Sequence, residues 1–106
     1  MKFVITESRR EQLIYKYLSD RYGGLLKADE PRMGLIFFLK DNGKDKLTSN
    51  DIVFHYAKDK QHASIPWEMV RDIEMFTGDE WESRQFVKKW LKKTYGIDPV
   101  KLYQKF

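Results

Sequence analysis

The residues best suited to binding chemistry lie near the C-terminal end of the sequence, on a helix predicted over residues 79–95. At 100° per residue, one arc of about 80° on this helix holds an indole, three cations and a phenol: Trp81, Arg84, Lys88, Lys92 and Tyr95. Cations neutralise phosphates and aromatic rings stack on bases, so this arc is typical of a surface that binds nucleic acid or a partner. Lysines four residues apart are also typical of a solvated helix face, which is the interpretation we favour from the sequence.

The chain has only two imidazoles, His55 and His62. If residues 52–62 were helical, His55, Asp59 and His62 would share one face and resemble a metal site of two histidines and one carboxylate. The β-branched and aromatic residues of segment 52–57 favour a strand, although the segment also fits a helical face that begins behind Thr48. We choose the strand, and therefore expect solvated histidines and no metal.

Motifs for catalysis are missing from the sequence. No serine lies in a G-x-S-x-G elbow, and no glycine-rich segment matches a phosphate-binding loop. Acid pairs such as Glu68 with Asp72 could act as general acid and base only if one were desolvated, and they are expected on the solvated polar face of a helix. With 0 Cys, disulfides, thiolate metal sites and a cysteine nucleophile are excluded. We expect no enzymatic activity and no cofactor.

A strand followed by a helix is expected at the N-terminal end. Residues 3–5 favour a short strand, and Thr6 or Ser8 then caps a helix, Ser8 forming an S-x-x-E capping box with Glu11. Apolar residues at helical spacing give this helix one buried face, made by Leu13, Ile14, Tyr17 and Leu18. Glycines at positions 23 and 24 end the helix, and residues 25–31 are interpreted as a connector.

The middle of the sequence predicts two strands. Residues 35–39 are Leu, Ile and Phe only, which is typical of a strand buried on both faces. The pair Asn42-Gly43 favours a type I′ hairpin turn. The chain returns either at once through residues 44–48 or later through residues 52–57, and we favour the later segment.

Two helices and a closing strand are expected in the last third. Ser64 and Pro66 mark a helix that ends at Gly78. Asp79 begins the third helix, which buries an apolar arc and ends at Gly96; the arc comprises Phe86, Val87, Trp90 and Leu91. Trp81 either stays on the surface or folds back on Trp67 across the Gly78 corner. Residues 100–103 are expected to form a strand that pairs with residues 3–5.

Composition limits the architecture to one domain. The chain has 106 residues, 42% of them hydrophobic, with 3 Trp, 6 Tyr, 7 Phe and a net charge of +4. A single core is the rule at this length, so residues 1–106 are expected to form one α+β domain, with about three helices on a small, mainly antiparallel sheet. The longest apolar run, 35–39, is far too short to span a bilayer, and we expect a soluble intracellular protein without membrane contact.

The first eight residues, Met-Lys-Phe-Val-Ile-Thr-Glu-Ser, match the pattern M-K-x-[VI]-I-T-E-S. This opening resembles that of many short uncharacterised proteins of tailed phages and viral metagenomes. The resemblance implies a phage origin and an accessory or virion role, with localisation in the host cytoplasm or the virion. It implies no catalytic residue.

Together these patterns predict a small non-enzymatic interaction or structural protein. A protein partner or self-assembly is the expected mode of action. The alternative is an accessory protein that binds nucleic acid through the basic and aromatic face near residues 80–95, defined above.

Overall fold

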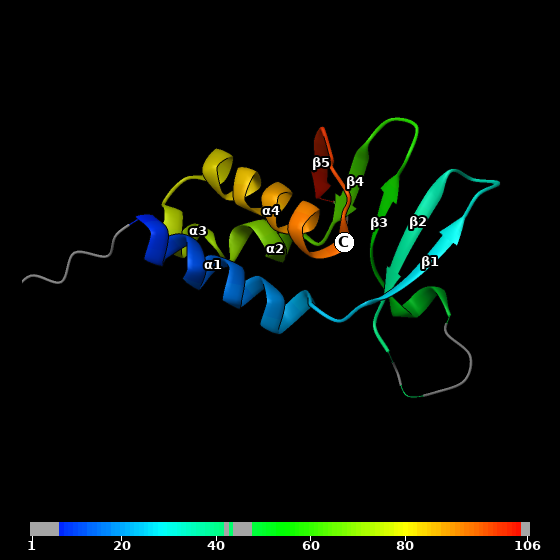
Figure 1. Cartoon of the computed structure of the whole chain (residues 1–106), viewed down its shortest axis with the longest axis horizontal. Helices are drawn as coiled ribbons and strands as arrows, with labels where there is room; N and C mark the ends of the chain where they lie inside the picture. The colour runs from blue at the N-terminus through cyan, green and yellow to red at the C-terminus, as the bar shows by residue number, and fades with distance from the viewer. Residues whose placement is uncertain (1–6, 42, 44–47, 105–106) are drawn as a thin grey trace, which may run out of the picture.

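The protein is an α+β domain in which helices pack on one five-stranded sheet (Figure 1). The structure is a computed structural model and describes residues 7–41, 43 and 48–104. Its helices are α1 (Glu7–Tyr22), α2 (Trp67–Arg71), α3 (Glu74–Thr77) and α4 (Glu80–Tyr95), with a 3-10 turn at Ser49–Asp51. Its strands are β1 (Leu26–Glu30), β2 (Leu35–Leu39), β3 (Ile52–Ala57), β4 (His62–Ile65) and β5 (Lys101–Gln104).

The strands follow one another across the sheet in the order β1-β2-β3-β4-β5. The first three pairings are antiparallel; the connections β1–β2 and β3–β4 are short, over residues 31–34 and 58–61, and let each strand return beside the one before it. β5 arrives through α4 and pairs with β4 in parallel, with Ala63 opposite Leu102. The expected return of the chain through residues 52–57 is confirmed. The expected partner of the last strand, residues 3–5, lies outside the described residues, as do Asn42 of the predicted hairpin turn and Thr6.

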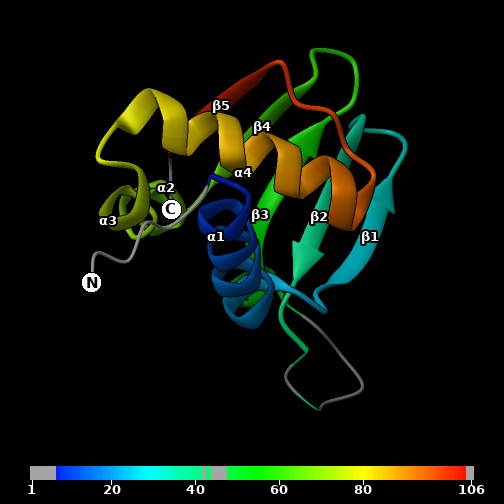
Figure 2. The same cartoon turned by 60° about the vertical axis from the view of Figure 1, so that its left-hand side comes forward.

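The core lies between the sheet and the pair α1 and α4, which cover the same face (Figure 2). Strand residues whose side chains point to this face stack directly on one another, with Phe38 and Phe54 ring centroids 4.4 Å apart. The two helices supply the opposing apolar residues, which are Ile14, Leu18, Val87, Trp90 and Leu91. Burial of these large side chains is the main stabilising contribution to the fold.

Strand β2 is buried most deeply on the face toward the helices. On the other face Leu39 is buried but Phe37 is only half-buried, so the predicted burial of both faces is partial. Ile36 and Phe38 are buried among the helices, whereas Phe37, one residue between them, points to the opposite face and is half-buried. There its ring lies 5.9 Å from the His55 ring, directly across from it on β3. The two faces of this wholly apolar run are therefore covered to different extents.

Two strands were absent from the sequence prediction. Residues 25–31 were expected to be a connector, yet most of them form β1. Ser64 was expected to cap a helix, but it is buried within β4, and the chain enters α2 one residue after Pro66. The single helix predicted to end at Gly78 consists of two short ones, α2 and α3, separated at Asp72 and Ile73.

Candidate functional site on helix α4

Capping residues fix both ends of helix α4. At its start, the Asp79 carboxylate accepts a hydrogen bond from the Glu82 backbone N–H at 3.0 Å, as an N-cap residue does. Ser83, which is fully buried, lies 2.6 Å from the Thr77 hydroxyl and donates to the Asp79 carbonyl at 2.8 Å. At its end, Gly96 takes the left-handed conformation with φ 72°, which a glycine adopts without strain.

The three cations of the predicted arc hold the C-terminal strand rather than standing free. The Arg84 guanidinium donates to the Leu102 carbonyl at 3.1 Å and to the Glu80 carboxylate at 3.2 Å. The Lys88 ammonium donates to the Val100 carbonyl at 2.9 Å, and Lys92 forms an ion pair with Asp98 at 3.7 Å. These residues follow the segment 98–102 as it returns along α4. Their spacing of four residues therefore matches a ladder of intramolecular contacts.

Tyr95 is half-buried and packs against the core instead of pointing outward with these cations. Its hydroxyl donates to the Tyr22 carbonyl and accepts from the Leu25 N–H at 3.2 Å. Its ring packs 4.8 Å from the Phe38 ring and 5.6 Å from the Trp90 ring. Burial raises the pKa of Tyr95 above its ordinary value of 10. Tyr95 thus joins the end of α1 and the start of β1 to α4.

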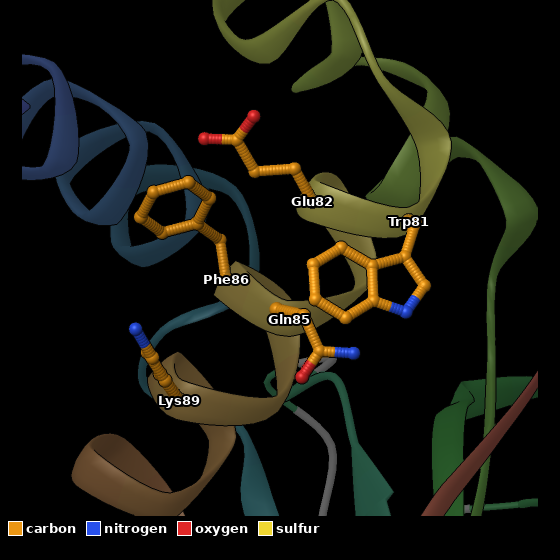
Figure 3. Close-up of a pocket in the computed structure, with 5 residues that line it drawn as sticks. All are labelled: Trp81, Glu82, Gln85, Phe86 and Lys89. Atoms are coloured by element: carbon orange, nitrogen blue, oxygen red, sulfur yellow. The ribbon is translucent and has the colours of Figure 1, made fainter.

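Trp81 is the aromatic residue of the predicted arc that faces solvent, with 68% of its surface exposed. It does not fold back under Trp67, whose ring is covered instead by the Arg71 guanidinium at 4.7 Å. Trp81 borders a hollow of about 290 Å³ on the outer side of the helix, which we call the α4 hollow; its lining residues are Trp81, Glu82, Gln85, Phe86 and Lys89. Figure 3 shows the Trp81 and Phe86 rings on either side of Gln85.

The walls of the α4 hollow are fixed by contacts with α1. The Phe86 ring meets the Tyr15 ring edge to face, with 6.2 Å between centroids. Glu82 accepts a hydrogen bond from the Arg10 guanidinium at 2.6 Å. Lys89 lies 5.7 Å from the Phe86 ring, and Lys93 lies 5.5 Å from the Tyr15 ring. The hollow therefore has aromatic side chains at Trp81 and Phe86, and at its rim Glu82 is paired with Arg10, whereas Lys89 has no ion pair among the described residues.

Sequence reasoning found Trp81 but missed the rest of the hollow. Phe86 was assigned to the buried arc, yet it is only half-buried because α1 covers one edge of its ring. Gln85 and Lys89 were assigned no role from the sequence. Their positions four and eight residues after Trp81 on the same helix are the only signal in the sequence that groups them.

The two histidines lie on neighbouring strands, His55 on β3 and His62 on β4. Both belong to the face of the sheet that points away from the helices. His55 faces Phe37, and the His62 ring lies 5.2 Å from that of Tyr103. Within residues 7–41, 43 and 48–104, no three His, Asp or Glu side chains are close enough together to hold a metal ion. Within the same residues, no helix has the length and apolar character needed to cross a bilayer.

Comparison with known protein families, with characterised proteins and with solved structures returned no match for this chain. Function is therefore inferred from the geometry of the described residues.

Proposed function

We propose that this protein is a non-enzymatic interaction protein that binds a protein partner through the α4 hollow. The observation that carries the proposal is the exposure of Trp81 beside a rigid aromatic wall. Tryptophan is the side chain most enriched among the residues that dominate protein–protein affinity. Exposing its ring to water is unfavourable, and covering it in a complex recovers that free energy.

The size of the hollow supports a side chain of a partner rather than a cofactor. Small-molecule sites usually enclose about 300–1,000 Å³, and the α4 hollow, at about 290 Å³, falls at the lower limit. An apolar side chain of a partner fits between the Trp81 and Phe86 rings. Lys89 and Lys93 lie on the same side, while Glu82 is engaged by Arg10. These charges favour a partner segment with acidic residues next to its apolar anchor.

Nucleic-acid binding through the predicted arc has less support. Phosphates would have to replace the carbonyls and carboxylates that Arg84, Lys88 and Lys92 already contact. The start of the helix also carries acidic residues beside Trp81, at Asp79 and Glu80, and these repel phosphate. We therefore keep nucleic acid as an outcome of the test.

The biological setting of the proposal comes from the opening eight residues, which resemble those of short phage proteins. On that resemblance we propose an accessory or virion role, in the host cytoplasm or in the particle. An interaction protein without catalytic chemistry is compatible with either place.

The test is affinity purification from the native source with three baits, each with and without nuclease. The baits are the wild type, Trp81→Ala and Met75→Ala, the last being a control because Met75 is 76% exposed on α3 outside the hollow. We expect one protein to be retained by the wild type and by Met75→Ala, lost with Trp81→Ala and unaffected by nuclease. Release by nuclease would favour the nucleic-acid function, and equal retention by all three baits would refute the role of the hollow.

A further inference from the structure

Strand β1 forms an edge of the sheet with its outer side exposed. In the part of the chain that the structure describes, β1 pairs with β2 and has no strand on its other side (Figure 1). Residues 26–29 are all exposed, and Leu26 keeps 40% of its surface accessible. The outward N–H and C=O groups of such a strand are a template for pairing with another strand.

The opposite edge of the sheet is protected in a way that β1 is not. There, α4 runs beside β5, and its side chains bind backbone carbonyls of the last segment, Arg84 at Leu102 and Lys88 at Val100. Side chains that occupy edge carbonyls compete with an incoming strand. At β1, the Asp29 carboxylate forms an ion pair with the Lys58 ammonium at 2.8 Å, which is a contact between side chains. It leaves the backbone of the strand available.

The charges of β1 are self-complementary in one register. When two copies pair antiparallel about a two-fold axis, residues that face each other point their side chains to the same side of the sheet. Each residue therefore faces a residue of the other copy whose number differs from its own by an even amount, and the axis lies between the two copies of one residue. An axis at Lys27 sets Lys27 against its own copy, and an axis at Asp29 sets Asp29 against its own copy; both place like charges together. An axis at Ala28 sets Lys27 opposite Asp29 twice, with small Ala28 residues facing each other at the centre.

The same register also covers exposed apolar surface. With the axis at Ala28, the turn over residues 31–34 of one copy falls beside the start of β1 in the other. That turn carries Met33, 64% of which is exposed. The start of β1 adjoins a hollow of about 410 Å³ of mixed character, in which Tyr22, Leu25 and Val53 are accompanied by Arg21, Lys40 and Asp41. Each copy thus offers both an apolar side chain and a recess to receive one.

We infer that β1 is the site at which two copies of this chain pair antiparallel about Ala28, joining their sheets into one of ten strands. This pairing is independent of the α4 hollow, which lies on a helix and not on the sheet edge. The dimer therefore presents two hollows, and a partner with repeated segments binds it more tightly than a monomer.

The first test is a charge swap followed by equilibrium sedimentation. We expect the wild type to dimerise at micromolar concentration. Lys27→Asp places acid against acid, and Asp29→Lys places base against base, so each variant alone should dimerise at least about tenfold more weakly. An equimolar mixture should recover a heterodimer, because opposite charges then face each other at both contacts. Lys60→Asp, the same charge change in an exposed turn, is the control and should dimerise like the wild type.

The second test uses the absence of cysteine from the natural sequence. Residues that face each other across an antiparallel pair have Cα atoms about 4.5–5.5 Å apart, within the range of a disulfide. Ala28→Cys should therefore cross-link into a covalent dimer under mild oxidation. Leu26→Cys is the matched control, because the two copies of position 26 lie about 14 Å apart in this register. A wild type that stays monomeric to about 500 μM, or equal cross-linking at both positions, would overturn the inference.

Discussion

Replacing Tyr95 with phenylalanine removes one oxygen atom and tests whether this residue is a structural clasp. The hydroxyl donates to the Tyr22 carbonyl and accepts from the Leu25 N–H, 73 and 70 residues away in sequence. The substitution keeps the ring, which packs against Phe38, Phe54 and Trp90. It leaves two backbone groups at the junction of α1 and β1 without that partner.

The magnitude follows from the two groups that lose their bond. A polar group left unsatisfied in the interior costs about 1–3 kcal/mol, and Tyr95 is only half-buried, so water compensates part of the loss. We expect Tyr95→Phe to lower the free energy of unfolding by about 1.5–3 kcal/mol. At about 2.1 cal/mol/K of unfolding entropy per residue, a chain of this length should melt about 7–14 °C lower.

The assay is urea unfolding followed by circular dichroism, with Tyr15→Phe as the matched control. The Tyr15 hydroxyl donates to the Glu11 carboxylate at 2.9 Å on the same helix and joins no separate segments. The control should therefore lose no more than about 1 kcal/mol. A change below about 0.5 kcal/mol for Tyr95→Phe would refute the clasp, and a loss of nucleic-acid affinity at unchanged stability would restore Tyr95 to the predicted binding surface.

Three further predictions concern the core, the tyrosines and the basic residues of α4. Phe38→Ala should lower the free energy of unfolding, measured in urea, by about 3–5 kcal/mol, because Phe38 is fully buried against Phe54. Phe37→Ala, at a half-buried position, should lower it clearly less. Equal losses would contradict the unequal burial of the two faces of β2. Burial, with the hydrogen bond and charge of Glu11, raises the pKa of Tyr15 to about 12, so the neutral phenol is favoured in the folded state. The contribution of Tyr15 to stability should be constant below about pH 10 and fall between about pH 10 and 12 in unfolding experiments, and Tyr15→Phe should reduce that fall. A triple variant in which Gln replaces Arg84, Lys88 and Lys92 should show faster amide hydrogen exchange in β5. The salt dependence of any DNA binding should not change. If the slope of log affinity against log salt flattened by about 2.7, the result would instead indicate three phosphate contacts.

Local sequence signals predicted the elements whose determinants lie within a few residues of one another. Helix α4 begins and ends as expected because the Asp79 carboxylate reaches an N–H three residues on, and because Gly96 accepts a left-handed backbone. The apolar run at 35–39 and the β-branched residues at 52–57 predicted β2 and β3 for a similar reason, since strand propensity acts residue by residue. Together with the length and composition, these signals were sufficient for the α+β class.

The elements that were missed depend on neighbours rather than on their own residues. The sequence Leu-Lys-Ala-Asp-Glu of β1 has little strand propensity, and it forms a strand because β2 supplies a row of backbone partners. Ser64 reads as a cap in isolation, but its place between β3 and β5 makes it a strand residue.

The sequence by itself determined the fold class, the main helices, and that α4 carries cations and aromatic rings at helical spacing. Only the tertiary structure decided what those side chains do. Helical periodicity places Trp81, Arg84, Lys88, Lys92 and Tyr95 on one arc, yet the return of residues 98–102 along α4 engages the cations, and the approach of α1 encloses Tyr95 and shapes the hollow beside Trp81. The physical reason is that a side chain's role depends on which backbone and solvent it meets. Those neighbours come from segments as many as 73 residues away.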